Sequence, residues 1–199
     1  MSFTDLLDPQ KIIVAFGLIG IISIIFIETG LFFGFFFPGD SLLFTAGFFA
    51  SQDLLPLSVL LFGTFLAAIV GDSVGYWTGK KVGPALFTRE DSLFFKKKYI
   101  SDAQHFYEKY GKKTIILARF VPIIRTFAPI VAGIGNMQYR IFITYNIIGA
   151  FIWTFGITLL GYFLGKTIPN VDKYLIPIII FIVLTSFIPA IAHLFKKKV

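Results

Sequence analysis

The chain has 199 residues, of which 56% are hydrophobic and 15% are charged, whereas a soluble domain carries about 25% charged residues. This composition predicts an all-α, polytopic membrane protein that forms one bundle and has no separate soluble domain. The sequence contains no cysteine, which excludes disulfides, thiolate metal sites and cysteine nucleophiles. Because His105 and His193 are the only imidazoles, we expect no metal site and no cofactor.

The net charge of +7 does not indicate a nucleic-acid partner, because the basic side chains are concentrated in two places. Residues 80–113 carry nine basic and four acidic side chains, and Lys196–Lys198 lie next to the carboxyl terminus. Basic segments of membrane proteins stay in the cytoplasm, so we expect both places to be cytoplasmic. Within residues 80–113 we expect an amphipathic helix lying on the membrane, with a solvated linker helix as an equal alternative.

In chain order, the sequence predicts a first helix at 11–28, a re-entrant hairpin at 29–53, a transmembrane helix at 54–79, the basic segment at 80–113, a second re-entrant hairpin at 114–137, and transmembrane helices at 138–166 and 174–195. Since a span takes about 20 apolar residues, the last two and residues 54–79 are long enough to cross a bilayer. With the first helix, this amounts to about three to four transmembrane helices.

The segment 114–137 is apolar but too broken and too charged for an ordinary span. It contains Arg119 and Arg125, and each would cost roughly 2.5–3.5 kcal/mol at the centre of a lone transmembrane helix. Its other interruptions are Pro122, Pro129, Gly133 and Gly135, and we expect the two glycines to permit a tight reversal. Broken backbone is tolerated at membrane depth only where protein or a wet cavity surrounds it, so the segment is predicted to form a site.

The charge distribution also predicts which side each hairpin enters. If 80–113 and the carboxyl terminus are both cytoplasmic, then 114–137 must enter from the cytoplasm and return there. By the same logic 29–53, interrupted by Pro38, Gly39 and Asp40, enters from the outer side if the amino terminus is cytoplasmic. The alternative makes both interrupted segments full spans, and it places the basic segment or the carboxyl terminus on the opposite side.

A shift of 86 residues aligns the two halves of the chain without gaps. Residues 45–80 and 131–166 share nine identities over 36 positions, and both end in the pattern GY-x-x-GK. The predicted directions of the halves are opposite, which is the inverted-repeat architecture of many secondary transporters. Asp40 aligns with Thr126, next to Arg125. One half therefore contributes acids and the other arginines, at comparable depth from opposite leaflets.

These residues also resemble a known family. The ordered set is Glu28, Phe37–Asp40, Gly71-Asp72, Gly75-Tyr76, Gly79, Arg119–Pro122, Arg125, Pro129, Ala132-Gly133, Met137, Asn146, Gly149-Ala150 and Trp153. It resembles the DedA family, whose core is also called the VTT or SNARE-associated domain. The resemblance implies lipid translocation. Bacterial members are linked to flipping undecaprenyl phosphate or phosphatidylethanolamine with the proton motive force, and eukaryotic relatives are scramblases.

The resemblance implies that the essential acids are Glu28 and Asp40 and that the essential arginines are Arg119 and Arg125. Many members have Glu at the position of Asp40. We expect the acids to couple protons and the arginines to bind a lipid phosphate bidentately. Arg119 could instead snorkel to the cytoplasmic interface, and the acids could be plain ion-pair partners. The expected supporting residues are Pro38, Gly39, Asp72, Pro122, Pro129, Gly133 and Asn146.

Two of these supporting residues, and Trp153, have more conservative interpretations. For Asp72, a structural cap or ion pair is slightly favoured over a ligand role. Asn146 and Trp153 are expected to serve interhelical packing and hydrogen bonding.

The sequence thus predicts a non-enzymatic lipid transporter of the cytoplasmic membrane, with a membrane lipid and protons as partners and no nucleic acid. A homo-oligomer is compatible with this prediction. The alternative function is a proton-coupled secondary transporter of a small anion or other solute that uses the same site.

Overall fold

The computed structural model describes residues 9–87 and 113–167, and these ranges contain helices and no strands. In chain order the elements are α1 (Pro9–Gly30), the 3-10 helix η2 (Gly34–Phe36), α2 (Gly39–Ser51), α3 (Leu57–Phe87), α5 (Thr114–Ala118), α6 (Pro122–Ile134) and α7 (Tyr139–Thr167). The expected all-helical fold is confirmed for these ranges. Most of the basic segment, and the span expected at 174–195, lie outside the described residues.

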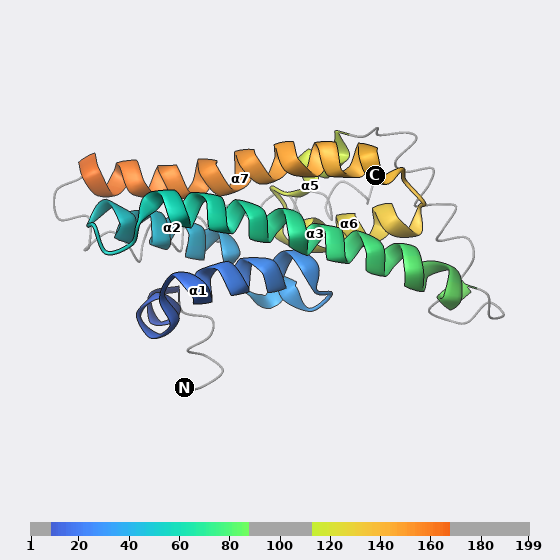
Figure 1. Cartoon of the computed structure of the whole chain (residues 1–199), viewed down its shortest axis with the longest axis horizontal. Helices are drawn as coiled ribbons and strands as arrows, with labels where there is room; N and C mark the ends of the chain where they lie inside the picture. Colours follow the sequence, from blue (N-terminus) through green and yellow to red (C-terminus); the bar gives the residue numbers. More distant parts are fainter. Residues whose placement is uncertain (1–8, 88–112, 168–199) are drawn as a thin grey trace, which may run out of the picture.

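Two helices, α3 and α7, run along most of the length of the bundle (Figure 1). Their apolar parts are Leu57–Val82, with 26 residues, and Tyr139–Thr167, with 29 residues. At the helical rise the shorter part measures about 39 Å, which exceeds a hydrocarbon core of about 30 Å. These helices agree in position with the expected spans at 54–79 and 138–166. The helix itself continues past the expected end of the span at residue 79, without a break to Phe87.

The outward faces of both long helices are apolar. On α3, the side chains of Phe62, Leu66 and Val70 are each about half exposed or more, and on α7 so are those of Phe151 and Phe163. A helix on the surface of a soluble protein carries polar side chains on this face. The exterior is therefore suited to lipid, in agreement with a membrane protein.

The first hairpin consists of α1 and α2. Helix α1 is interrupted at Gly17, whose φ of 56° suits glycine, and it ends at Gly30. The chain then reverses through residues 31–38, and α2 runs back. Near the beginning of α1, Ile13 packs with buried side chains of α2 and α3, so α1 starts at the end of the bundle where α2 passes into α3.

This arrangement corrects the expected division between a crossing helix at 11–28 and a hairpin at 29–53. Residues 18–30 form one helical arm that continues directly into the first hairpin. The physical reason is that Glu28 finds its partner inside the bundle, as described below, so α1 can end in the middle of the bundle.

The second hairpin consists of α5 and α6, with its tip at residues 119–121. Pro122 occupies the first turn of α6, where its missing N–H removes no helical bond. Of the two glycines expected to permit a reversal, Gly133 lies inside α6, which continues through Pro129 to Ile134, whereas Gly135 is the C-cap of α6 and begins the turn that leads into α7. Ile115 of α5 packs with Ala132 and Phe142, at the end of the bundle opposite the start of α1. In Figure 1 the two hairpins accordingly extend inward from opposite ends.

At two glycines, a helix of one aligned half of the chain packs closely against a helix of the other half. Gly161 of α7 lies against the carbonyl of Phe44 in α2, and Gly133 of α6 lies against the carbonyl of Tyr76 in α3. A Cβ atom at either glycine would overlap these backbone atoms. Each hairpin helix thus packs on the long helix of the other half, and the tips of the hairpins are held in the middle of the bundle.

This packing predicts a stability difference between two glycines of α7. Gly161→Ala places a methyl group against the backbone of Phe44, and overpacking of this kind costs typically about 1–3 kcal/mol. We expect a lower unfolding temperature for this variant in detergent. Gly156→Ala is the matched control, because a Cβ there meets nothing within 4 Å. Equal unfolding temperatures for the two variants would contradict the close-packing role of Gly161.

Candidate functional site

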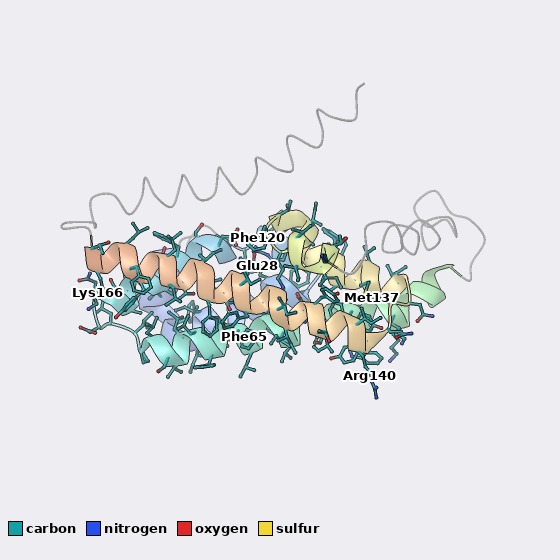
Figure 2. The ribbon with its side chains drawn as sticks, turned by 90° about the horizontal axis from the view of Figure 1, so that it is seen from above. Glu28, Phe65, Phe120, Met137, Arg140 and Lys166 are labelled. Carbon is teal, nitrogen blue, oxygen red and sulfur yellow. The ribbon has the colours of Figure 1, made fainter. Side chains whose placement is uncertain are left out.

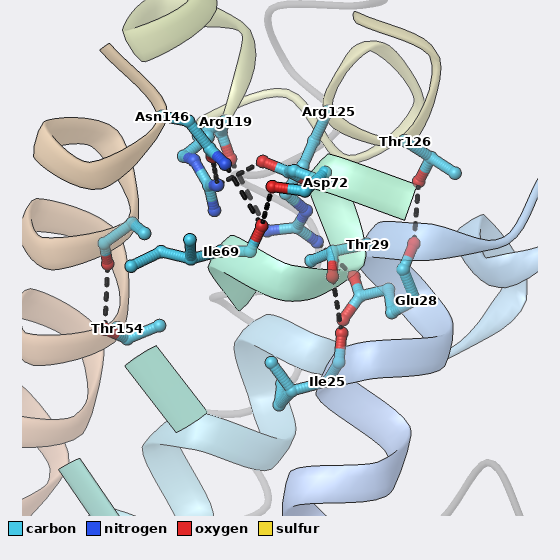
Figure 3. Close-up of polar contacts among 12 residues, drawn as sticks. Ile25, Glu28, Thr29, Ile69, Asp72, Arg119, Arg125, Thr126, Asn146 and Thr154 are labelled. Atoms are coloured by element: carbon cyan, nitrogen blue, oxygen red, sulfur yellow. Dashed lines mark hydrogen bonds and ion pairs between the residues drawn. The ribbon is translucent and has the colours of Figure 1, made fainter. Parts of the chain in front are cut away.

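The candidate site lies where the tips of the two hairpins meet. Glu28 is in the middle part of the bundle, between Lys166 at one end and Arg140 and Met137 at the other (Figure 2). The four expected site residues Glu28, Asp40, Arg119 and Arg125 come from α1, α2 and the two sides of the second tip. The structure brings them together with Asp72, Asn146 and Trp153 in one cluster, most of which is shown in Figure 3.

Arg125 joins the two hairpins. Its side chain is 1% exposed, and its Nη1 donates to Oδ1 of Asp40 over 2.7 Å. Its Nη2 forms an ion pair with Oε1 of Glu28. Nearby, Oγ1 of Thr126 donates to the carbonyl of Glu28 over 3.2 Å. Both acids of the first hairpin therefore share one arginine of the second.

Gly39 explains why the tip of the first hairpin takes this shape. A Cβ atom at Gly39 would overlap the carboxylate of Glu28, so only glycine lets this acid lie against the start of α2. Pro38 precedes it at the N-cap of α2, and Asp40 follows in the first turn. An acid in that turn is favoured by the helix dipole.

Arg119 makes a second set of contacts, to the long helices. Its Nη2 forms an ion pair with Asp72 of α3 and donates to Oδ1 of Asn146 of α7. Asn146 in turn donates from Nδ2 to the carbonyl of Ile69 over 3.2 Å. Arg119 is 2% exposed, so it does not snorkel to the interface, which was the alternative interpretation of this residue.

Trp153, for which the sequence predicted interhelical packing and hydrogen bonding, is part of the site. Its Nε1 donates to Oδ1 of Asp40 over 2.7 Å, so this carboxylate accepts from both Trp153 and Arg125. The guanidinium of Arg125 lies 4.3 Å from the centre of the indole ring, and that of Arg119 lies 6.0 Å from it. A cation over an indole face is attracted to it. The repeat pairs Trp153 with Ala67, so the alignment gave no signal for this role.

Two features give the cluster its chemical capacity. Among the described residues, the buried cluster contains three carboxylates, of Glu28, Asp40 and Asp72, and two guanidinium groups. Three guanidinium nitrogens, Nε and Nη1 of Arg119 and Nε of Arg125, donate to no atom of the described residues. The same part of the chain contains no group of three or more His, Cys, Asp and Glu that could hold a metal ion. The arrangement is suited to binding an anion and exchanging protons.

Other expected supporting residues lie outside the cluster. Gly133 contacts Tyr76 through its backbone approach, and Pro129 lies against Gly75. Both therefore contribute to packing between α6 and α3. Pro122 starts α6 and so sets the position from which Arg125 reaches the acids.

The fold and the site define a helical membrane protein with a charged cluster enclosed between two hairpins. Comparison with known proteins then gives the family. A family model described as the VTT domain matches residues 37–163, a range that includes every cluster residue except Glu28. No solved structure matches the chain.

The chain has bacterial relatives, several of which are described as membrane proteins. It is 48% identical over 177 residues to protein DedA of Escherichia coli (strain K12), covering 88% of this chain and 80% of that protein. It is 46% identical over 198 residues to an uncharacterized membrane protein of Mycobacterium tuberculosis (strain ATCC 25618 / H37Rv), covering 96% and 86% respectively. It is 30% identical over 175 residues to the inner membrane protein YqjA of Escherichia coli (strain K12), covering 87% and 77%. The chain therefore belongs to the DedA family of membrane proteins, whose core is the VTT domain.

The ion pair of Asp72 with Arg119 predicts non-additive effects on stability. Asp72→Leu leaves a buried guanidinium without its carboxylate, which typically costs about 3–5 kcal/mol. We expect Asp72→Leu to lower the unfolding temperature more than Asp72→Leu combined with Arg119→Leu, because the double variant leaves no unpaired charge. Thermal unfolding in detergent checks this order. If the double variant is as unstable as the sum of the two single variants, the pair does not act as a unit.

Proposed function

We propose that this protein moves a phosphate-bearing membrane lipid, either a phospholipid or a polyprenyl phosphate, across the cytoplasmic membrane in a process coupled to protons. The observation that carries the proposal is the sharing of Arg125 by Glu28 and Asp40 between two half-length hairpins. No covalent bond of the lipid changes in this process, so the proposed activity is transport rather than enzymatic catalysis.

Phosphate recognition is supported by the arginines. A guanidinium is planar and presents its donors in a fork that matches phosphate oxygens. The donors of Arg119 and Arg125 that have no partner in the described residues are available to such oxygens. A phosphate that approaches Arg125 also competes with Glu28 and Asp40 for its charge.

Proton coupling is supported by the charge balance of the cluster. If all three carboxylates were ionised, they would exceed the two guanidinium groups by one negative charge within the described residues. An uncompensated charge in a buried site costs several kcal/mol, and one bound proton removes it. Since Asp72 is paired with Arg119, we assign the proton to Glu28 and Asp40, which share Arg125. Entry of phosphate then changes the proton occupancy of this pair.

Alternating access is supported by the crosswise fold. We propose that the two hairpins are re-entrant from opposite leaflets and that they are the matching parts of an inverted repeat. With the basic end of α3 in the cytoplasm, the start of α1 lies at the outer end. This differs from the sequence prediction, which reached the hairpin from a cytoplasmic amino terminus through a full span. A cytoplasmic carboxyl terminus, reached through the span expected at 174–195, remains part of the proposal.

A small anion is the alternative substrate, because the same cluster would bind inorganic phosphate. The lipid is favoured by the apolar exterior of the hairpin tips, where Phe32, Phe33 and Phe36 of the first tip and Phe120 of the second are each about half exposed or more. These side chains suit a path along which acyl chains stay in the bilayer while the headgroup enters.

The arginine role predicts loss of transport in Arg125 variants. In liposomes that contain the purified protein and a headgroup-labelled phospholipid or polyprenyl phosphate, we expect Arg125→Ala and Arg125→Lys each to lower the rate by at least about tenfold. Lysine keeps the charge but loses the fork. Arg140→Ala, which removes an exposed arginine at the start of α7, is the matched control. Normal rates in both Arg125 variants, or uptake of inorganic phosphate without lipid movement, would contradict the proposal.

The acid role predicts a change in coupling. We expect Glu28→Gln to retain the fold, because glutamine has nearly the same shape, and to lose the response of lipid transport to an imposed pH gradient. The measurement is the ratio of transport rates with and without the gradient in sealed liposomes. If wild-type protein shows the same rate before and after collapse of the gradient, proton coupling is wrong even if the arginine variants are inactive.

A further inference from the structure

A groove outside the charged cluster runs along α3. Its larger part, with a volume of about 670 Å³, lies between α1 and α3 and is lined by side chains that include Ile22, Phe26 and Ile27 of α1 and Leu66 and Val70 of α3. These are apolar, and Ser23 is the one hydroxyl among the lining residues.

The smaller part of the groove, with a volume of about 370 Å³, continues from the larger part along α3. It is lined by Val70, Ser73, Val74, Trp77, Thr78 and Lys81, among others. Val70 lines both parts. The lining residues recur along α3 at intervals of three and four residues, so they share one face of the helix. The distance from Gly63 to Lys81 along α3 is about 27 Å at the helical rise, which is close to the thickness of a hydrocarbon core.

The chemistry changes along this face. The part shared with α1 is apolar, whereas the far end offers the hydroxyl of Thr78, the indole of Trp77 and the ammonium of Lys81. Trp77 is 51% exposed, and tryptophan and lysine are typical of the membrane–water interface. The neighbouring Lys80 is engaged differently, because its Nζ lies 5.9 Å and 5.4 Å from the ring centres of Tyr76 and Trp77.

We propose that this groove is a binding track for one anionic membrane lipid, with its phosphate at Lys81 and Thr78 and a hydrocarbon chain along Val74 and Val70. The charge at one end and the apolar length behind it match an amphipathic anion better than an extended peptide segment, which would leave backbone polar groups in an apolar groove. The larger groove ends at Ile27, next to Glu28 in the sequence. The track rests on the proposed function in one respect: we take the lipid that it binds to be a substrate that moves on to Arg125.

Binding can be measured separately from transport, because the chain has two tryptophans and only Trp77 lies in the groove. The full chain is reconstituted in phosphatidylcholine vesicles, and phosphatidylglycerol with brominated chains is added in increasing fractions. The quenching of Trp77 is obtained as the difference in tryptophan fluorescence quenching between the wild type and Trp77→Phe. We expect half-maximal quenching at a lipid fraction about fivefold higher for Lys81→Gln, the effect of one lysine near a membrane surface. Arg140→Gln, with the same loss of charge at the same end of the bundle, should behave as the wild type.

The outcomes separate the track from the charged cluster. Arg125→Lys, which keeps a positive charge between Glu28 and Asp40, should still bind the brominated lipid, so failure of the transport proposal leaves this result intact. Equal quenching by brominated phosphatidylglycerol and brominated phosphatidylcholine, or an unchanged Lys81→Gln, would overturn the track. Displacement by soluble glycerol phosphate would identify a free-phosphate site and would also overturn it.

Occupation of the groove by protein is the remaining outcome. Because the chain contains no cysteine, Val74→Cys introduces a unique thiol. We expect a lipid-soluble thiol reagent to label it in vesicles and added phosphatidylglycerol to slow the labelling. A thiol that stays unlabelled in vesicles but reacts after unfolding would show that another part of the protein covers the groove, and the lipid track would be wrong.

Discussion

The structure depends on one interaction, the contact of Arg125 with Glu28 and Asp40. It joins the tip of one hairpin to the tip of the other, so each half of the chain supplies what the other lacks. Arginine and carboxylate are costly in an apolar bundle unless they are paired and hydrogen-bonded. Pairing within each half is not available, because one tip carries the acids and the other the arginines. The two halves therefore need each other electrostatically as well as through packing.

The rest of the bundle holds this contact in place. Helices α3 and α7 provide the length, and their contacts with α6 and α2 at Gly133 and Gly161 hold the hairpin tips in the middle of the bundle. A second layer of contacts, from Asp72 and Asn146 to Arg119, fixes the residue at which the second hairpin turns. Trp153 connects the layers, because it donates to Asp40 and its ring faces both arginines. Such a site is enclosed but built from separate elements, which fits the alternating access that we propose.

The sequence predicted the parts of this arrangement that depend on composition and charge. The length of the apolar runs located α3 and α7, and opposite charges in the aligned halves predicted that Glu28 and Asp40 would face the arginines. The hairpin tips were less accessible, because a glycine looks the same in sequence whether it permits a turn or a close approach. Gly133 was interpreted as a turn and is a packing contact, whereas Gly17 breaks α1 and was not singled out. Trp153 could not be separated from packing aromatics, because its indole N–H finds Asp40 only through the fold.

The central claim is that the phosphate of a membrane lipid reaches Arg125 and replaces the carboxylates there. Its most direct test is magnetic-resonance measurement of the distance between lipid phosphorus and guanidinium nitrogen, in protein labelled with 15N-arginine and reconstituted in liposomes. The account predicts a phosphorus–nitrogen contact that is equally strong in the wild type and in Arg140→Lys, and that in Arg125→Lys is reduced to the part that Arg119 provides. A wild-type protein that transports lipid without any such contact, or a contact of undiminished strength in Arg125→Lys, would contradict it.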